Sequence, residues 1–335
     1  MKLRVAVIGM GPIGNLHSRI YKSDDLAQLV GVCDRDAERA TAAGDRYGVP
    51  HFTEAAKMLA ALQPDLVSVA TGGFEYSSDH YEPTLQALEQ GCHVLCEKPI
   101  CNNLDRAREM VAAARRLKRC FGIDLNHRFT PAAYTAHQWL ADGKLGDLLF
   151  CNMALWIGKF GTFDSVNYHL KALNPHSVNM MVWYCGPIEA VQCFAVKAPG
   201  RDIWSTASFN MKFASGAVGH LTSSYDIARA HRVERCEVAG ARGRLVVDDM
   251  WQKATLYPAD SMEQRVYANP VFGGYKDFDD TFRERIHRFL QQVSDGVAPE
   301  SIDGSGEEGL YAQRVIEAAI RSLDEGNRSV MLDEV

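Results

Sequence analysis

A glycine-rich turn near the N-terminus limits what this chain can fold into more than any other feature. Residues 5–8 are apolar and typical of a short strand, and glycines follow in the spacing G-x-G-x-x-G, at Gly9, Gly11 and Gly14. The first glycine permits a tight turn, the second leaves room for a pyrophosphate, and the third lets a helix pack closely. Pro12 suits the first turn of that helix, whose N–H groups and dipole attract phosphate. The sequence therefore predicts a dinucleotide-binding turn.

An acidic residue further along the chain supports this interpretation. The next predicted strand, residues 29–33, ends at Asp34, twenty residues after Gly14. A carboxylate there can accept hydrogen bonds from both hydroxyls of an adenosine ribose, and it repels the 2′-phosphate of NADP. Arg35 could pair with that phosphate instead. The pattern favours NAD, with NADP as the alternative.

Length and charge narrow the class of protein. The chain has 335 residues, enough for two domains, and a net charge of −6 from 36 basic and 42 acidic side chains. We therefore expect no nucleic acid and no anionic membrane as a partner. The apolar N-terminal stretch is too short for a signal peptide, and no window approaches the ~18 apolar residues of a membrane span. These features predict a cytoplasmic protein.

The cysteines predict a reducing compartment and no metal site. Nine cysteines form an odd and scattered set, and most of them lie in apolar runs, as small buried thiols do. Cys92, Cys96 and Cys101 are close in sequence, but their spacing matches no zinc pattern.

The order of predicted elements indicates two domains of different class. Up to residue 125, strands alternate with helices, which is typical of a parallel sheet covered on both faces. From residue 126, strands come in series and only a few helices interrupt them, the clearest at residues 131–140, 176–184, 278–294 and 307–323. Residues 257–276 read as a surface loop. We predict an α/β Rossmann domain at 1–125 and an α+β domain at 126–335.

A charged motif is expected at the edge of the first sheet. Glu97, Lys98 and Pro99 directly follow a predicted strand at residues 93–96, so they belong at the carboxyl edge, where ligands of such sheets bind. An ammonium group there can bind a substrate hydroxyl and stabilise the alkoxide character that develops as hydride leaves its carbon. Pro99 would hold the turn rigid and could do so through a cis peptide bond.

Taken together, these motifs resemble the Gfo/Idh/MocA oxidoreductases, a family that includes glucose-fructose oxidoreductase and inositol dehydrogenase. The resemblance covers nearly the whole chain. The residues that carry it are the glycine triplet with His17, Val32-Cys-Asp34, Val69-Ala-Thr71, His80, Ala87-Leu-Glu-Gln-Gly91, His93 to Pro99, Asn126-His-Arg-Phe-Thr-Pro131, His176 seven residues before Trp183, and Glu308-Gly-Leu310.

The resemblance implies an architecture and a reaction. Such proteins join a Rossmann domain to an α+β domain with a large, mostly antiparallel open sheet, which commonly buries its face in a homodimer or homotetramer. They use NAD or NADP to move hydride between nicotinamide and the carbinol of a sugar, cyclitol or sugar derivative. The alternatives on the same scaffold are a glycoside hydrolase that uses NAD transiently and a non-catalytic regulator that senses a dinucleotide.

The resemblance also implies which residues act. Lys98 and His176 would be catalytic, with the histidine as general base, a role that suits imidazole near neutral pH. The cofactor would be bound by Gly9, Gly11, Pro12, Ile13, Gly14, Asp34, Arg35, Thr71, Gly72, His80, Glu97 and Lys98. The substrate would be bound by Lys98, Arg128, Trp156, His169, Asn174 and His176. No residue is assigned to a metal.

The chain departs from its relatives beside the expected base. Many relatives carry an aspartate four residues before this histidine and another three residues after it, whereas Ala172 and Asn179 stand there in this chain. His176 therefore works without a carboxylate, or it is oriented by His169, Lys171 or Asn174.

Overall fold

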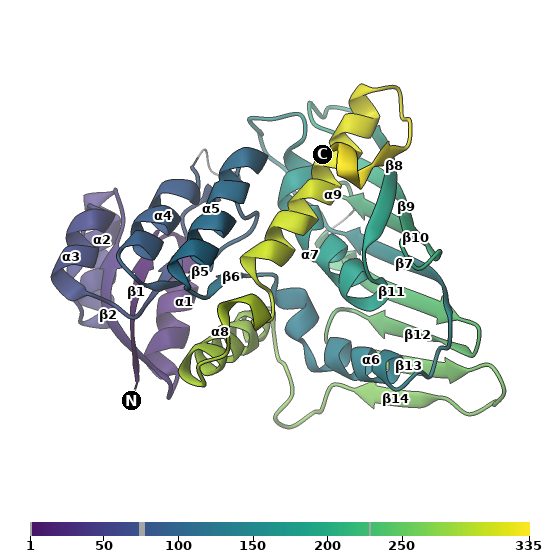
Figure 1. Cartoon of the computed structure of the whole chain (residues 1–335), viewed down its shortest axis with the longest axis horizontal. Helices are drawn as coiled ribbons and strands as arrows, with labels where there is room; N and C mark the ends of the chain where they lie inside the picture. Colours follow the sequence, from purple (N-terminus) through teal and green to yellow (C-terminus); the bar gives the residue numbers. More distant parts are fainter. Residues whose placement is uncertain (1, 74–77, 228) are drawn as a thin grey trace. The chain divides into compact units, whose positions relative to one another are not determined.

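The computed structural model describes residues 2–73, 78–227 and 229–335. The chain divides into two compact units, which are described one at a time (Figure 1). The first unit comprises Met1–Leu125 and Phe278–Tyr311, and the second comprises Asn126–Asp277 and Ala312–Val335.

The first unit is built on a parallel sheet of six strands. The strands are β1 (Leu3–Ile8), β2 (Ala27–Cys33), β3 (His51–Phe52), β4 (Leu66–Val69), β5 (His93–Cys96) and β6 (Phe121–Ile123). Their order in the sheet is β3-β2-β1-β4-β5-β6, and every neighbouring pair is parallel. The strand order reverses between β1 and β4, and this is the point of a doubly wound sheet where ligands bind. The expected Rossmann fold is confirmed.

Helices cover both faces of this sheet because its strands are apolar on both sides. Val5 and Val7 of β1 belong to one core cluster, whereas the alternating Ala6 and Ile8 belong to another. The first cluster is covered by α1 (Pro12–Ser23), α2 (Ala37–Tyr47) and α8 (Asp279–Ser294). The second is covered by α3 (Ala55–Leu62), α4 (Tyr81–Glu89) and α5 (Leu104–Leu117).

Helix α8 packs in the first unit, although the sequence analysis placed residues 278–311 in the second domain. Its residues Phe282, Ile286 and Phe289 are buried in the same core cluster as strand β1. The spacing of these residues identifies an apolar helix face, but periodicity does not say which sheet that face covers.

The second unit contains a nine-stranded open sheet among its described residues. Its strands are β7 (Leu148–Trp156), β8 (Ile188–Val196), β9 (Thr206–Phe213), β10 (Val218–Ser224), β11 (Val233–Gly240), β12 (Gly243–Asp248), β13 (Lys253–Pro258), β14 (Arg265–Ala268) and β15 (Val330–Met331). The order is β14-β13-β12-β11-β7-β10-β9-β8-β15, and only the β10–β7 pair is parallel. The expected mostly antiparallel sheet is therefore confirmed. Strand β14 corrects the prediction of a loop at residues 257–276.

Two helices pack on one face of the second sheet (Figure 1). They are α6 (Pro131–Ala141) and α7 (Tyr168–Cys185), and the hydroxyl of Tyr184 donates to the carbonyl of Ala133. The sequence analysis expected this helix at residues 176–184, directly after Pro175, a residue type that usually ends a helix. In the structure Pro175 lies inside the helix, where burial among neighbouring elements stabilises the extra turns.

The remaining elements complete the second unit and link the chain. A 3-10 helix, η2 (Asn126–Phe129), precedes α6, and α9 (Gly306–Asp324) begins among residues of the first unit and ends among those of the second.

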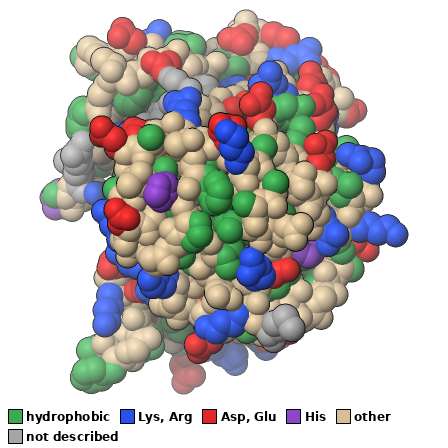
Figure 2. Space-filling view, turned by 90° about the vertical axis from the view of Figure 1, so that its left-hand side faces the viewer, with side chains coloured by type: hydrophobic (Ala, Val, Ile, Leu, Met, Phe, Trp, Pro, Cys, Tyr) green, Lys and Arg blue, Asp and Glu red, His purple; other side chains and the backbone are tan. Residues whose placement is uncertain are grey.

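Among the helices of the described ranges, none combines the length and the apolar character needed to cross a bilayer. On the face drawn in Figure 2, acidic and basic side chains are interspersed.

Candidate active site

The glycine turn has the geometry that its spacing predicts. Gly9 has a φ of 95°, and a Cβ there would lie 2.5 Å from the backbone nitrogen of Thr71. A Cβ on Gly14 would lie 1.7 Å from the carbonyl oxygen of Gly9. Any side chain at either position would therefore displace backbone, so both glycines are required by the fold itself.

Gly11 differs from its two neighbours in the motif. It is the N-cap of α1, ahead of Pro12 and Ile13 in the first turn, and no described atom lies within 4 Å of the position that its Cβ would take. The protein does not need a glycine there for its own packing. The open space lies at a helix N-terminus, which is where a pyrophosphate fits.

Asp34 lies beside this turn at the end of β2. Its carboxylate is mostly buried and accepts hydrogen bonds from the backbone N–H of Met10, at 2.7 Å, and of Asp36, at 2.9 Å. These two contacts fix the carboxylate and leave acceptor capacity on both oxygens for ribose hydroxyls. The exposed Arg35 follows it directly.

A buried histidine connects the ends of two neighbouring strands. The Nδ1 atom of His80 lies 2.8 Å from the carbonyl oxygen of Pro99, after β5, and its Nε2 atom lies 3.1 Å from the carbonyl oxygen of Thr71, after β4. The hydroxyl of Thr71 donates to the carbonyl of Asp79, while Gly72 is exposed. His80 thus fixes the relative position of two loops at the carboxyl edge of the sheet.

The residues Glu97, Lys98 and Pro99 follow β5 at this same edge. Lys98 is partly exposed, whereas Glu97 is buried, and the peptide bond between Lys98 and Pro99 is cis. The glycine turn, Asp34 and Lys98 therefore all follow strands of one parallel sheet at its carboxyl edge.

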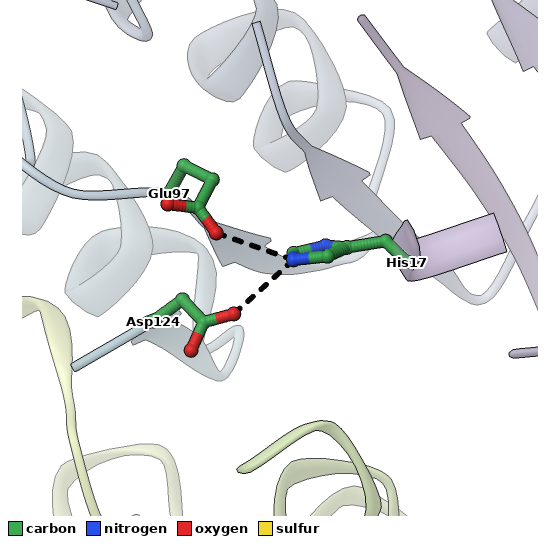
Figure 3. A group of neighbouring side chains, drawn as sticks. All are labelled: His17, Glu97 and Asp124. Carbon is green, nitrogen blue, oxygen red and sulfur yellow. Dashed lines mark ion pairs between the residues drawn. The ribbon is translucent and has the colours of Figure 1, made fainter. Parts of the chain in front are cut away.

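Glu97 belongs to a buried charged cluster under the turn. The Nε2 atom of His17 lies 3.2 Å from Glu97 Oε1 and 3.2 Å from Asp124 Oδ2 (Figure 3). The other ring nitrogen of His17 lies 2.8 Å from the hydroxyl of Ser68. His17 extends from α1, and the two carboxylates follow β5 and β6, so the cluster joins three elements of the first unit.

The charges of this cluster support one another. Burial acts to lower the pKa of His17, but hydrogen bonds to Asp124 and Glu97 outweigh it and raise that pKa to about 9. Burial also acts to raise the pKa of Glu97, yet the hydrogen bond from His17 holds it below its ordinary value. Burial and the charge of Glu97 raise the pKa of Asp124. At neutral pH the cluster therefore holds an imidazolium between two carboxyl groups.

This cluster is also the arrangement closest to a metal site among the described residues. Ligand-type atoms of His17, Glu97 and Asp124 lie within 4.8 Å of one another. The buried guanidinium of Arg285 acts on Asp124 as a further positive charge. A protonated His17 and Arg285 together balance the two carboxylates, so the charges favour a proton over a metal cation at this place.

The expected base lies in the second unit and stacks on another histidine. The ring of His176, on α7, lies parallel to the ring of His127, on η2, with centroids 3.8 Å apart and planes 4° from parallel. The Nδ1 atom of His127 lies 2.9 Å from Glu234 Oε1, on β11. All three side chains are buried. A carboxylate is thus linked to His176 through one intervening ring.

Arg128 lies next to this stack in the sequence. Its guanidinium is buried and lies over the ring of Trp183, 5.4 Å from the centroid, and over the ring of Phe129, at 5.1 Å. The helical turn η2 therefore brings both His127 and Arg128 against α7, where His176 and Trp183 lie.

Three other predicted substrate residues lie elsewhere in the second unit. His169 is wholly buried and bonds the carbonyl of Trp204, and burial lowers its pKa to about 4. Asn174 is wholly buried and donates to the carbonyl of Leu170. The structure therefore gives both of these side chains contacts in the interior of the unit.

Trp156 is separated from the stack by the pleat of the sheet. In the β7–β11 ladder, Leu155 pairs with Glu234, which reaches His127 on the helix-covered face. Trp156 is the next residue, so it points to the opposite face, and its indole donates to the carbonyl of Thr222. The structure does not bring Trp156 together with His176.

Sequence patterns alone identify neither Glu234 nor the partners of His17. A signal for Glu234 was present, because it alternates with Cys236 and Val238, which are inward-facing positions of the same strand. Asp124 gave a similar signal, since it directly follows a buried strand at the carboxyl edge. Neither pattern says which histidine the carboxylate reaches.

Comparison with known families connects both units to one group of enzymes. Residues 3–125 match the family described as "Oxidoreductase family, NAD-binding Rossmann fold", and residues 134–246 match the "GFO/IDH/MocA C-terminal domain". The first match begins in strand β1 and the second ends in strand β12.

Individual relatives are sugar and cyclitol dehydrogenases. D-glucoside 3-dehydrogenase of Escherichia coli is 38% identical over 148 residues, which are 44% of this chain and 41% of that protein. The chain thus matches about two fifths of that relative's length. Myo-inositol 2-dehydrogenase of Thermotoga maritima is 24% identical, and its alignment covers 99% of each chain.

Solved structures share the whole fold. Levoglucosan dehydrogenase, crystallised with NADH and levoglucosan, superposes with a TM-score of 0.88 at 19% identity, covering 99% of this chain and 100% of that one. An oxidoreductase from Klebsiella pneumoniae, described as NAD-binding, gives the same TM-score at 22% identity and covers 99% of each chain. Both family matches and both folds agree with the motifs described above, and the chain belongs to the Gfo/Idh/MocA family of NAD-binding oxidoreductases.

Proposed function

We propose that this protein is an NAD-dependent dehydrogenase that oxidises a carbinol of a sugar, cyclitol or sugar derivative to the ketone, or reduces the ketone. One observation carries the proposal. The glycine turn after β1 and Lys98 after β5 lie at the same edge of one parallel sheet, in a chain of this oxidoreductase family. The relatives named above act on D-glucosides and myo-inositol, which makes polyhydroxylated rings the substrate class to test.

The cofactor fits the first unit on the evidence of its backbone. The open space at Gly11 suits a pyrophosphate at the N-terminus of α1, with Gly9, Pro12, Ile13 and Gly14 shaping the turn. Asp34 would accept the ribose hydroxyls, which favours NAD over NADP, and Arg35 would lie at the same end. Thr71, Gly72, His80 and Glu97 would line or support the remainder of the site.

Two side chains would carry the chemistry. When bound, the nicotinamide takes up the hydride that leaves the carbinol carbon. The ammonium of Lys98 would donate a hydrogen bond to the substrate oxygen and stabilise the negative charge that grows on it. His176 would accept the hydroxyl proton, so that the O–H bond breaks as an N–H bond forms on the ring. Arg128 would bind a further hydroxyl of the substrate. Trp156, His169 and Asn174 would act less directly, given the contacts described above.

A turnover assay tests this function. Wild-type protein is incubated with NAD and a panel that includes myo-inositol, D-glucosides and levoglucosan, while the absorbance of reduced nicotinamide is followed. We expect stoichiometric NADH formation with at least one compound. Lys98→Ala should lower kcat by about 10²–10³, the usual cost of removing one donor to a developing oxyanion. The matched control is Lys57→Ala, at an exposed lysine of α3.

The same assay separates the two alternative functions. Cleavage of a glycoside without net NADH formation would identify a hydrolase that uses NAD transiently. Saturable NAD binding without turnover of any compound would identify a regulator. Near-normal turnover by the Lys98→Ala variant would remove Lys98 from the mechanism.

We also propose that the protein is a cytoplasmic homodimer or homotetramer that associates through the second sheet. The face of that sheet opposite α6 and α7 carries Phe194, Val196 and Val218, which are 47%, 55% and 57% exposed. Exposed apolar side chains on an open sheet favour a partner surface. All nine cysteines are buried free thiols, which suits a reducing compartment.

A further inference from the structure

A carboxylate is connected to the expected base by a route that the sequence does not show. Many relatives would place an aspartate at Ala172 or at Asn179 to serve His176. In this structure the ring that faces His176 belongs to His127, and the carboxylate that holds His127 belongs to Glu234. Glu234 lies on β11, 58 residues beyond His176 in the sequence.

The three residues form a rigid chain of contacts. Glu234 Oε1 lies 2.9 Å from Nδ1 of His127, which orients that ring. The His127 ring then stacks on His176 with planes only 4° from parallel, which fixes the plane of the second ring. The three side chains are 4% to 7% exposed, so surrounding atoms keep both rings in place.

The charges of this group limit how many protons it can hold. Glu234 is buried and its only described hydrogen bond is to His127, so solvent screens its effect on the two rings very little. Two imidazolium rings with centroids 3.8 Å apart would repel each other strongly. One carboxylate beside two rings can therefore balance one bound proton, the one that His176 accepts from the substrate.

We propose that His127 and Glu234 are positioning residues for His176, an inference that rests on the function proposed above. Glu234 orients His127, and His127 holds the His176 ring in the plane from which it accepts the substrate proton. When the O–H bond of the substrate breaks and the proton binds His176, the negative charge of Glu234 stabilises the new positive charge on the stack. This pair does the work of the aspartate that Ala172 replaces.

Other ionisable groups lie on the elements of the second unit that carry the stack or pack against those elements. They are Arg128 of η2, Tyr184, Cys185 and Lys171 of α7 (Lys171 paired with Glu317 of α9), His137 of α6, Cys151 of β7 and Cys236 of β11. Burial raises the pKa of Tyr184 well above its ordinary value, and a hydrogen bond with Cys185 is the main cause that raises the pKa of Cys151. The described helix-facing positions of β9 and β10, such as Phe209, Met211 and Leu221, carry no ionisable group.

Kinetics of matched variants test the proposal. Glu234→Gln keeps the shape of the side chain and removes its charge, and Glu237→Gln makes the same change three residues along β11, where the side chain pairs with Arg244. We expect Glu234→Gln to lower kcat at least tenfold, a part of the ~10²–10⁴ that a positioned base contributes. The acidic limb of its kcat profile should move to lower pH, with the KM for NAD unchanged. Glu234→Asp should recover part of the loss, and Glu237→Gln should match the wild type.

A merely structural role for Glu234 would give a different result. Two outcomes would overturn the proposal. In the first, kcat of Glu234→Gln falls but the acidic limb of its pH profile stays where it is in the wild type. In the second, kcat of the variant equals that of the wild type at every pH. Folding is checked by tryptophan fluorescence, because all five tryptophans lie between residues 139 and 251, in the second unit.

A second measurement does not depend on turnover. In protein labelled at its histidines, NMR follows the titration of the His176 ring, whose signal is identified by its loss in His176→Asn. We expect the midpoint of this titration to move to lower pH in Glu234→Gln, because the negative charge that favours the bound proton is gone. An unchanged midpoint would overturn the proposal. Absence of any dehydrogenase activity in the wild type would instead refute the proposed function and leave this result readable.

Discussion

The buried His17 cluster makes a quantitative prediction about stability and pH. The pKa of His17 is raised in the folded chain from 6.5 to about 9, because hydrogen bonds to Asp124 and Glu97 outweigh the effect of burial. The pKa of His17 therefore differs by roughly 2.5 between the unfolded and the folded chain. At about 1.4 kcal/mol for each pKa unit, this difference corresponds to about 3 kcal/mol of free energy of unfolding. His17 is fully buried, so solvent does not screen this contribution.

The sign follows from the direction of the change. Because the folded state binds this proton more tightly than the unfolded state, the stabilisation is complete below pH 6.5 and is lost as the pH rises through about 9. His17→Gln keeps a donor but no charge, so its first unit should lack this loss between pH 6.5 and 9. At pH 6 the variant should be less stable by ~3–5 kcal/mol, the usual cost of breaking a buried ion pair.

Hydrogen exchange is the suitable assay for this unit, since the five tryptophans all lie in the other one. Peptides from α1 and β5 are followed between pH 6 and pH 9.5, after correction for the intrinsic exchange rate. Over this pH range, the protection factors of the wild type should fall about a hundredfold more than those of His17→Gln. The double variant His17→Gln/Asp124→Asn should recover stability at low pH, because one buried carboxylate is removed.

His287→Gln serves as the control, because the His287 side chain is 45% exposed and solvent screens its pair with Asp24, so that the pair contributes at most ~1 kcal/mol. Its pH dependence should follow the wild type. If His17→Gln and the wild type lose protection in parallel as the pH rises, His17 is not the imidazolium of this cluster and the charge assignment is wrong.

Three further predictions concern the cofactor and the assembly. Gly11→Val should leave the unfolding midpoint almost unchanged but weaken NAD binding, as measured by calorimetry. Gly14→Ala should instead destabilise the first unit, because the added Cβ would meet the carbonyl of Gly9. Asp34→Ser should raise the KM for NAD and bring the KM values for NAD and NADP closer together, since the charge that repels the 2′-phosphate of NADP is removed. Val218→Lys should shift the mass measured by light scattering towards that of a monomer; an unchanged mass would exclude this face as the contact.

The features that the sequence predicts well are those encoded by neighbouring residues. The glycine spacing fixes the turn, because Gly9 and Gly14 contact backbone within a few residues or one strand away. Asp34 and Lys98 are located equally well, since they follow the buried strands β2 and β5 within two residues and the carboxyl ends of parallel strands share an edge.

The features that the sequence misses depend on contacts between distant segments. Periodicity gives helix α8 an apolar face but not the sheet that it covers. Helix α7 begins at Tyr168 and not at residue 176, because the surrounding packing overrides the local preference of Pro175 against a helix interior. The partners of His176 are missed for the same reason, because His127 and Glu234 reach it from 49 residues before and 58 residues after in the chain.

The central claim is that this protein moves hydride between a polyol carbon and NAD. The most direct test uses the best substrate of the panel, deuterated at the reacting carbinol carbon, with NAD and the wild-type protein in ordinary water. NMR of the reduced nicotinamide should show one deuterium at C4 for each substrate oxidised, and Lys98→Ala should form this product at least ~10² more slowly. Reduced nicotinamide that carries no deuterium, or substrate consumed without any reduction of NAD, would contradict the account.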